Sequence, residues 1–331
     1  MSSVQVYREI DFERQRIMIS AKKLNKSYGR HRVLDHLDLE VTTGSVLGFI
    51  GPNGAGKSTA MKIICGIFPP DSGEVTVSGI DMIADPVRAK ENLGYLPENA
   101  PLYSGMSVAA FLRFCGRMRG LSGSRLKSSY ERVVEICRLK DVLRMDVDSL
   151  SKGFRRRTCL AQSLIHSPEN LVLDEPTDGL DPDQKREIRS LILELKKETA
   201  VIVSTHILEE IGAVCDHVLA IRQGRAVFYG TSGEFRKLSS EEGAVLLKLA
   251  SGTDPAAFQD FPEASSLTFR KDGDFAFLKL YPRPGKEKLL SVAAVNFAAA
   301  QNIKILECEV LHADPGQIFA ELGKEMGEKS C

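Results

Sequence analysis

The strongest signal in this sequence is the stretch Gly51-Pro52-Asn53-Gly54-Ala55-Gly56-Lys57-Ser58-Thr59. It fits G-x-x-x-x-G-K-[ST] and lies between an apolar run, 46–50, and a helix-compatible run, 60–64. Glycines let successive backbone N–H groups turn towards a phosphate, and the following helix adds the positive end of its dipole. We expect Lys57 to reach the outer phosphates and Ser58 to offer its hydroxyl to Mg²⁺. An ordinary glycine-rich turn is the alternative, but the glycines and the Lys-Ser pair are in register. The stretch therefore predicts a bound nucleotide, without saying what that nucleotide drives.

A second candidate site is an apolar strand that ends in two acids, Leu171-Val172-Leu173-Asp174-Glu175. An Asp at a strand end beside a phosphate-binding loop holds Mg²⁺ in many nucleotide hydrolases. Glu175 lies one residue farther on, where a carboxylate is able to orient or deprotonate an attacking water. On its own, the stretch is more typical of a strand followed by a charged turn. Together with the upstream loop, it favours nucleotide hydrolysis.

Length and composition indicate a globular protein of two domains. The chain has 331 residues, of which 43% are hydrophobic and 27% charged, and its formal net charge is zero. A neutral chain lacks the broad basic field on which many nucleic-acid proteins rely, so we expect no nucleic-acid partner. Contact with another protein stays open.

Cysteine usage and hydropathy indicate a cytosolic protein without a membrane span of its own. The seven cysteines are odd in number, widely spaced and form no C-x-x-C pair, which favours reduced thiols without a structural zinc site. No run approaches the roughly 18 to 20 apolar residues of a spanning helix. Residues 1–16 are polar and charged, so we expect a tail there, with a short helix possible over 7–16, and no signal peptide.

The pattern along the chain predicts an α/β domain over 17–235 and an accessory domain over 236–331. Alternating apolar positions predict strands from residue 17 onwards, and residues 74–77 with the Ser-Gly pair that follows predict a hairpin. Helical spacing dominates about 104–168, and beyond 170 strands alternate with helices, as in a mainly parallel sheet. The accessory domain shows the order βαββαβ, which fits a small α+β, ferredoxin-like fold.

Several further motifs resemble those of the ATP-binding cassette (ABC) ATPases, and the resemblance spans roughly residues 17–230. These motifs stand in the order of that family, and six together are highly specific. They are Lys26-Ser27-Tyr28-Gly29 (adenine-stacking aromatic), Gly94-Tyr95-Leu96-Pro97-Glu98 (Q-loop), Leu150-Ser151-Lys152-Gly153-Phe154 (L-S-G-G-Q), Asp174-Glu175-Pro176-Thr177, Gly179-Leu180-Asp181-Pro182 (D-loop) and Ser204-Thr205-His206 (switch histidine).

The resemblance implies a P-loop cassette with a mixed sheet core, an antiparallel β part and a helical subdomain. In that family two cassettes sandwich two ATP molecules, so Ser151 and the Gly153 backbone would bind the γ-phosphate held by the partner copy. His206 would sense the γ-phosphate, and Asp181 would lie at the dimer seam. A turn histidine and a surface tyrosine are the plain alternatives for His206 and Tyr28.

Two departures from the family pattern stand out. Glu98 occupies the Q-loop position of Gln, and a carboxylate cannot donate an amide hydrogen bond, although its hard oxygens suit Mg²⁺. Lys152 and Phe154 replace Gly and Gln of the L-S-G-G-Q segment, while Ser151 and Gly153 remain. Beyond that segment, Arg155, Arg156 and Arg157 are expected either to contact a partner or phosphate, or to form a solvated first helical turn.

The residues over 94–103 and 150–155 look like those of bacterial exporter-associated cassettes, especially the gliding-motility and multidrug types. The resemblance implies an ATPase that forms a homodimer, or pairs with a second cassette, and docks on transmembrane permease subunits. The protein would then lie at the cytoplasmic face of the inner or plasma membrane. A soluble ABC ATPase acting on ribosomes or DNA is the rival class, but no second phosphate loop or sustained heptad pattern is present. A regulator without turnover is disfavoured because Glu175 and His206 are both intact.

Overall fold

The computed structural model describes residues 16–99, 102–205, 207–239, 241–250, 255–273, 275–312, 317–319 and 322. The chain divides into two compact units, Met1–Ser232 and Gly233–Cys331. The tail predicted over 1–16 lies outside these described residues except for Arg16.

A six-stranded sheet forms the centre of the first unit, and it confirms the α/β fold expected from the sequence. Its strand order is β10-β9-β3-β8-β7-β6, with every pair parallel except β9 and β10. The strands are β3 (Val46–Ile50), β6 (Leu93–Leu96), β7 (Asn170–Asp174), β8 (Ala200–Ser204), β9 (His217–Arg222) and β10 (Arg225–Thr231). The three strands β3, β7 and β8 are buried along their whole length, which explains their continuous apolar sequences.

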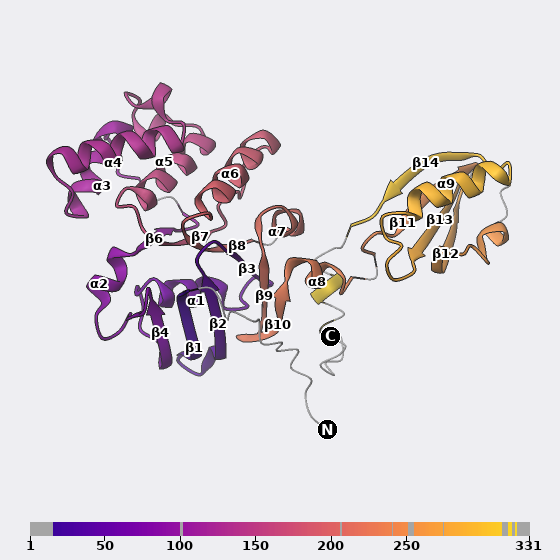
Figure 1. Cartoon of the computed structure of the whole chain (residues 1–331), viewed down its shortest axis with the longest axis horizontal. Helices are drawn as coiled ribbons and strands as arrows, with labels where there is room; N and C mark the ends of the chain where they lie inside the picture. The colour runs from indigo at the N-terminus through magenta and orange to yellow at the C-terminus, as the bar shows by residue number, and fades with distance from the viewer. Residues whose placement is uncertain are drawn as a thin grey trace. The chain divides into compact units, whose positions relative to one another are not determined.

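A four-stranded antiparallel sheet, β2-β1-β4-β5, packs against the central sheet with helix α1 (Lys57–Ile64) between them (Figure 1). Its strands are β1 (Ile17–Tyr28), β2 (His31–Thr42), β4 (Ser72–Val77) and β5 (Ile80–Asp81), and β4 and β5 form the predicted hairpin. One apolar core joins residues of both sheets and of the helix, among them Ile19, Phe49 and Met61. The core therefore fixes α1, and with it the loop before α1, against both sheets.

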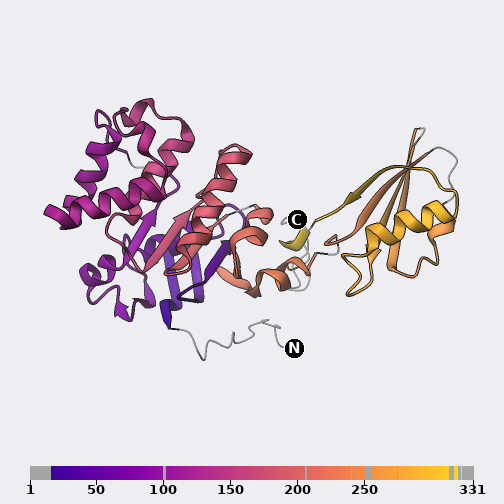
Figure 2. The ribbon, with the colours of Figure 1, turned by 45° about the horizontal axis from the view of Figure 1, so that its top comes forward.

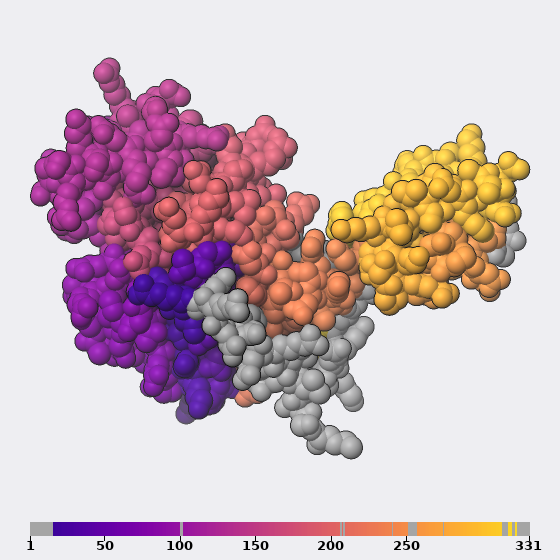
Figure 3. Space-filling view, viewed as in Figure 1, coloured from indigo at the N-terminus to yellow at the C-terminus, as the bar shows by residue number. Residues whose placement is uncertain are grey.

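Helices α3 (Val108–Met118), α4 (Gly123–Ile136) and α5 (Lys152–Leu164) form the helical segment expected over about 104–168. They make a magenta lobe beside the violet and indigo part of the same unit (Figure 3). Ser107 caps α3 by accepting a hydrogen bond from the Ala110 N–H at 3.2 Å, and Phe111 and Leu112 on the buried face anchor the helix. Short 3₁₀ turns, Lys140–Val142 and Val147–Ser149, lie between α4 and α5.

Further helices complete the described part of this unit. They are α2 (Pro86–Glu91), α6 (Pro182–Leu195) and α7 (Leu208–Val214), with α8 (Ser232–Arg236) at the boundary of the two units. Within the described part of the chain, no helix combines the length and apolar character needed to span a lipid bilayer.

The second unit is an antiparallel sheet with one helix on a face (Figure 2). Its strand order is β12-β13-β11-β14, and α9 (Leu290–Ala300) buries Leu290, Ala294 and Ala298 in its own core. The strands are β11 (Val245–Ala250), β12 (Ala264–Asp272), β13 (Phe275–Pro282) and β14 (Ile305–Val310). The order along the chain is the predicted βαββαβ, except that a single 3₁₀ turn, Pro255–Phe258, stands in the place of the first helix. Of the last helix expected over 315–322, residues 317–319 and 322 are described and helical, and the other four lie outside the described residues.

Candidate nucleotide-binding site

The predicted phosphate-binding loop connects β3 to α1 and is tightly enclosed at its two defining glycines. A side chain at Gly51 would place Cβ 2.4 Å from the Ile221 carbonyl oxygen. At Gly56, where φ is +110°, Cβ would lie 2.7 Å from the Val33 carbonyl oxygen. Both contacts involve backbone atoms that cannot swing away, so only glycine fits at either position. The motif spacing thus reflects the close approach of this loop to β9 and β2.

Lys57 lies at the start of α1 and turns back over the loop. Its buried ammonium donates hydrogen bonds to the carbonyl oxygens of Gly51 at 2.6 Å and Pro52 at 3.2 Å. Ser58 and Thr59 follow in the first helical turn, which contains no acidic side chain. The positive end of the helix and the Lys57 charge therefore act together, as binding of a phosphate requires.

Three acidic residues from two segments gather around Lys57. Burial lowers the pKa of Lys57, and the carboxylates of Glu175, Asp174 and Glu98 oppose this shift, in that order. Glu98 comes from the segment after β6, and the other two from the end of β7. The structure thus brings together the residues that the sequence singled out from three distant motifs.

Asp174 is buried, and Ser204 at the end of β8 holds it in place. The Ser204 hydroxyl donates to Asp174 Oδ1 at 2.6 Å and accepts a hydrogen bond from the Glu175 backbone N–H at 2.9 Å. Burial raises the pKa of Asp174, while the Ser204 hydrogen bond and the charges of Arg156 and Lys57 lower it. Ser204 was recognised in the sequence only as part of the switch motif, and its bridging role follows from the parallel pairing of β7 with β8.

Glu175 adopts a left-handed backbone conformation, with φ of 47°. Only glycine and a few polar residues occupy this region readily, so a glutamate there marks local strain. This turn redirects the chain after β7. Backbone strain of this kind persists only where the surrounding structure holds it, and it is concentrated at functional sites.

Glu210 is a site-supporting residue that the sequence analysis missed. It is buried on α7 and accepts a hydrogen bond from Thr177, which follows Glu175, and one from the Thr205 hydroxyl at 2.7 Å. It thereby ties the end of β7 to the end of β8. Its place in the acidic start of a helix gave no sequence signal for this role.

The donor set beside Lys57 fits Mg²⁺. Asp174 and Glu98 supply carboxylate oxygens and Ser58 a hydroxyl oxygen, all hard ligands. Across the described ranges, no group of three or more His, Cys, Asp or Glu side chains is arranged to hold a metal by itself. Mg²⁺ usually keeps several waters and takes further oxygens from substrate phosphates, so a two-carboxylate set suits it better than a protein cage would.

Ser151, Gly153 and Asp181 lie at the N-termini of two neighbouring helices. Ser151 caps α5, which begins at Lys152, and it accepts a hydrogen bond from the Phe154 N–H at 3.4 Å. Asp181 caps α6 through the Gln184 N–H at 2.8 Å, and a Cβ at Gly153 would lie 2.7 Å from the Gln184 side chain. None of these contacts involves the phosphate loop. Ser151 and Asp181 are exposed.

Two predicted residues remain, Tyr28 and His206. Tyr28 ends β1 with 49% of its side chain exposed, and the Lys26 ammonium lies 5.8 Å from its ring centroid. His206 lies outside the described residues, so its predicted role stays a prediction.

The expectation of a solvated turn for three consecutive arginines is wrong for the middle one. Arg156 is 6% exposed, because α5 turns that side chain towards the segments after β6 and β7. Arg155 and Arg157 instead lie near the carboxylates of Asp148 and Glu187.

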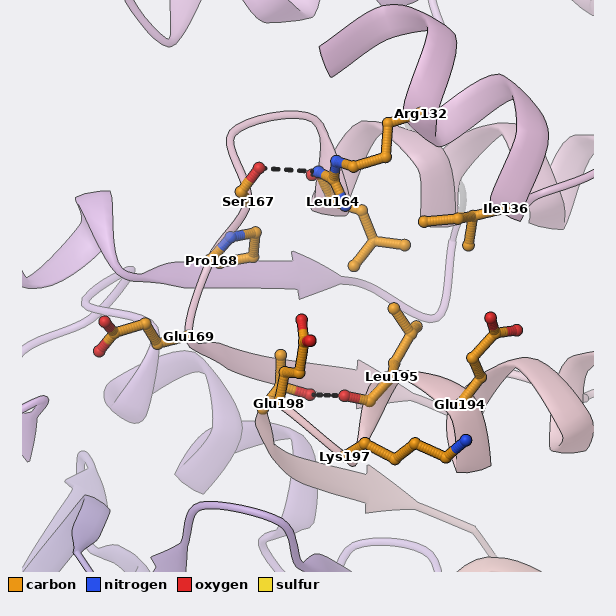
Figure 4. Close-up of a pocket in the computed structure, with 11 residues that line it drawn as sticks. Arg132, Ile136, Leu164, Ser167, Pro168, Glu169, Glu194, Leu195, Lys197 and Glu198 are labelled. Carbon is orange, nitrogen blue, oxygen red and sulfur yellow. Dashed lines mark hydrogen bonds between the residues drawn. The ribbon is translucent and has the colours of Figure 1, made fainter. Parts of the chain in front are cut away.

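A separate cavity of about 460 Å³ contains none of the predicted site residues (Figure 4). Arg132 of α4 crosses it to donate to the Leu164 carbonyl at 2.6 Å and the Ser167 hydroxyl at 2.9 Å. Its lining comprises Arg132, Ile136, Leu164, Ser167, Pro168, Glu169, Glu194, Leu195, Lys197, Glu198 and Thr199.

Comparison with known proteins agrees with this geometry. A family model described as "ABC transporter" matches residues 34–178. The Nod factor export ATP-binding protein I of Cupriavidus metallidurans is 34% identical over 237 residues, which cover 70% of this chain and 76% of that protein. The chain belongs to the ABC transporter family. Homologues of its cassette domain are ATP-hydrolysing ATPases of transporters.

Other relatives are ATP-binding subunits of bacterial transporters or resistance systems. It is 36% identical over 229 residues to the "Probable multidrug ABC transporter ATP-binding protein YbhF" of Escherichia coli; the match covers 68% of the chain but only 39% of that protein. It is 28% identical over 310 residues to the "Linearmycin resistance ATP-binding protein LnrL" of Bacillus subtilis, covering 92% of the chain and 98% of that protein. A solved structure titled "Structure of ATP binding subunit of ABC transporter" superposes with a TM-score of 0.61 at 28% identity, covering 66% and 92% of the two chains.

Proposed function

We propose that this ABC protein hydrolyses ATP to ADP and phosphate and thereby drives a separate transmembrane permease of exporter type. The observation that carries the proposal is the meeting of Lys57, Asp174, Glu175 and Glu98 around one phosphate-binding loop. Multidrug and Nod factor export proteins among the relatives support the exporter type. ATP is the substrate, and the protein would lie at the cytoplasmic face of the membrane, held there by its permease.

Each residue of the cluster has a role that its position supports. The loop N–H groups and Lys57 bind and orient the phosphates of ATP, and Tyr28 offers an exposed ring on which adenine can stack. Glu175 takes the proton from the attacking water, and the strained turn fixes its direction. Mg²⁺, held by Ser58, Asp174 and Glu98, would neutralise phosphate charge in the transition state.

The exposed Ser151 and Asp181 support a second part of the proposal, that two copies pair with ATP between them. A helix N-terminus that presents free N–H groups beside a serine attracts an anion, yet the contacts of Ser151 stay within its own helix turn. A γ-phosphate bound to the loop of a second copy would satisfy this site. ATP binding would then close the dimer and hydrolysis reopen it, which shifts the population of permease states.

Exposed apolar side chains on and near α2 support docking on the permease. Val87 on α2 is 70% exposed and Ile83 just before it is 53% exposed. Apolar side chains on an exposed surface beside polar neighbours are typical of protein interfaces.

The decisive experiment measures mass in solution. We expect Glu175→Gln to bind ATP without hydrolysing it, and so to accumulate as a dimer with doubled mass by light scattering in MgATP. Lys57→Ala is the matched control, because it removes the phosphate-binding charge and should stay monomeric and inactive. A wild-type chain that releases no phosphate from ATP contradicts the enzymatic role, and a monomeric Glu175→Gln variant in saturating MgATP contradicts the dimer.

A further inference from the structure

The Arg156 side chain is built into the interior beneath the nucleotide site. It lies in the second turn of α5 between two arginines that face carboxylates, Asp148 for Arg155 and Glu187 for Arg157. The hydrogen bonds of Arg156 among the described residues go instead to backbone carbonyls. A buried guanidinium that donates only to backbone carbonyl oxygens fixes the conformation of the main chain around it.

Two segments meet at this guanidinium. Its Nη1 donates to the carbonyl oxygens of Pro97 at 3.0 Å and Glu98 at 2.6 Å. Its Nε donates to the carbonyl of Pro176 at 3.1 Å, and its Nη2 donates to the carbonyls of Asp174 and Glu175. A guanidinium has five N–H groups, and each one finds a carbonyl here. The two segments lie far apart along the chain. The hydrogen bonds of Arg156 therefore link them directly.

The bridged segments carry the acidic side chains of the site. Residues 97–98 position the Glu98 carboxylate, and residues 174–176 position those of Asp174 and Glu175. At Glu175, Ser204 holds the N–H and Arg156 holds the carbonyl, so both ends of this left-handed residue are fixed. Holding a strained backbone in one conformation is a task that needs such double restraint.

Nearby acidic groups favour the charged form of the Arg156 guanidinium. Burial lowers the pKa of Arg156, while the thiol of Cys159 and the carboxylates of Asp174, Asp178 and Glu175 raise it. Arginine remains charged in proteins even when buried, because its guanidinium is delocalised and weakly hydrated. Lysine keeps the charge but has three donors on one atom, so it is able to serve only one of the two segments well.

We propose that Arg156 is a positioning residue for ATP hydrolysis: it locks residues 97–98 to residues 174–176, so that Glu98 and Glu175 keep fixed places relative to Lys57. This inference rests on the proposed function for its kinetic consequence. The lock itself is a property of the chain without nucleotide. Arg156 touches neither substrate nor the reacting atoms, so its effect is on turnover rather than on ATP binding.

The test compares Arg156→Gln and Arg156→Lys with the wild-type chain. We expect kcat to fall by at least about tenfold for the Gln variant, with KM and nucleotide affinity within about twofold, since misplacing a catalytic group removes an interaction made in the transition state. The Lys variant should recover part of the kcat. Arg138→Gln, which removes an exposed arginine paired with Glu187 at 3.2 Å, is the matched control and should leave turnover unchanged.

Amide hydrogen exchange gives a second readout that needs no activity. In the Arg156→Gln variant we expect faster exchange in peptides over 94–99 and over 171–178 together, and no change in α9 of the second unit. Wild-type kcat in the Gln variant, or loss of protection in only one of the two segments, overturns the lock. If the wild-type chain itself fails to hydrolyse ATP, the proposed function falls, while the exchange data still test the lock. If the Gln variant does not fold, the Lys variant carries the same comparison, and a wild-type kcat in it overturns the proposal.

Discussion

Glu98 places a second carboxylate beside Lys57 and Asp174, where the pattern of the family has an uncharged amide. If it is a magnesium ligand, Glu98→Gln removes one charged oxygen donor and weakens the metal site. We expect the Mg²⁺ concentration for half-maximal ATPase activity to rise at least about threefold, which corresponds to about 0.7 kcal/mol of lost metal binding. A magnesium titration at saturating ATP measures this. An unchanged titration curve would show that Glu98 is a neutral replacement.

His166 gives the first unit a pH dependence of its own. Burial and the charges of Arg119 and Arg132 together lower its pKa to about 4, against a hydrogen bond to the Leu93 carbonyl at 3.1 Å that opposes the shift. The folded state therefore binds this proton less tightly than the unfolded chain. The stabilisation is complete above the unfolded pKa of about 6.5 and is lost as pH falls from there towards 4.

We expect His166→Gln to flatten this part of the profile. Gln keeps a donor near the Leu93 carbonyl but does not titrate. In urea unfolding followed at pH 7, 6 and 5, the wild-type unit should lose stability more steeply than the variant, by at most about 1.4 kcal/mol per pH unit. Parallel profiles for the two proteins would show that His166 titrates normally in the folded state.

At the scale of single elements, β6 depends on a close approach to α5. A Cβ at Gly94 would lie 2.4 Å from the Ser163 carbonyl oxygen and 2.7 Å from Leu171 Cδ2. Gly94→Ala must therefore push β6 away from α5 or from β7, and we expect a loss of about 1 to 3 kcal/mol in unfolding free energy. Gly233→Ala is the control, because a Cβ there meets nothing within 4 Å. Equal stability of both variants would mean that β6 shifts at no cost.

The strands differ in how well their own sequences predict them. Strands β3, β7 and β8 are wholly buried, so their unbroken apolar runs predicted them. Strand β6 has only four residues and includes Gly94, and its sequence was interpreted only as a motif. Strand β10 is a partly exposed edge with weak alternation, and it was not predicted. Short and edge strands are formed by their neighbours, which a local pattern does not contain.

The same reason separates the site residues that were predicted from those that were missed. Lys57, Asp174 and Glu175 stand in fixed spacing because one loop and one strand end hold them. Arg156 and Glu210 act through contacts with segments far away in the chain, Arg156 58 residues from Glu98. Nothing in the run of three arginines indicates which one turns inward.

For the whole molecule, the two units have separate apolar cores. We therefore expect two transitions in calorimetric unfolding, with MgATP raising only the midpoint of the first unit. For the Glu175→Gln variant, ATP at about 100 times its dissociation constant should stabilise that unit by about 2.7 kcal/mol. A single unfolding transition whose midpoint rises with MgATP would show that the two units unfold together.

The left-handed backbone at Glu175 sets a limit on how far this protein can be made more robust. Glycine at this position would relax the main chain, and screens for thermal tolerance would select it. The same change deletes the carboxylate on which turnover depends in the proposed mechanism. Laboratory evolution for heat resistance would then select stable variants that no longer hydrolyse ATP. This trade-off between stability and activity follows from the backbone conformation of one residue.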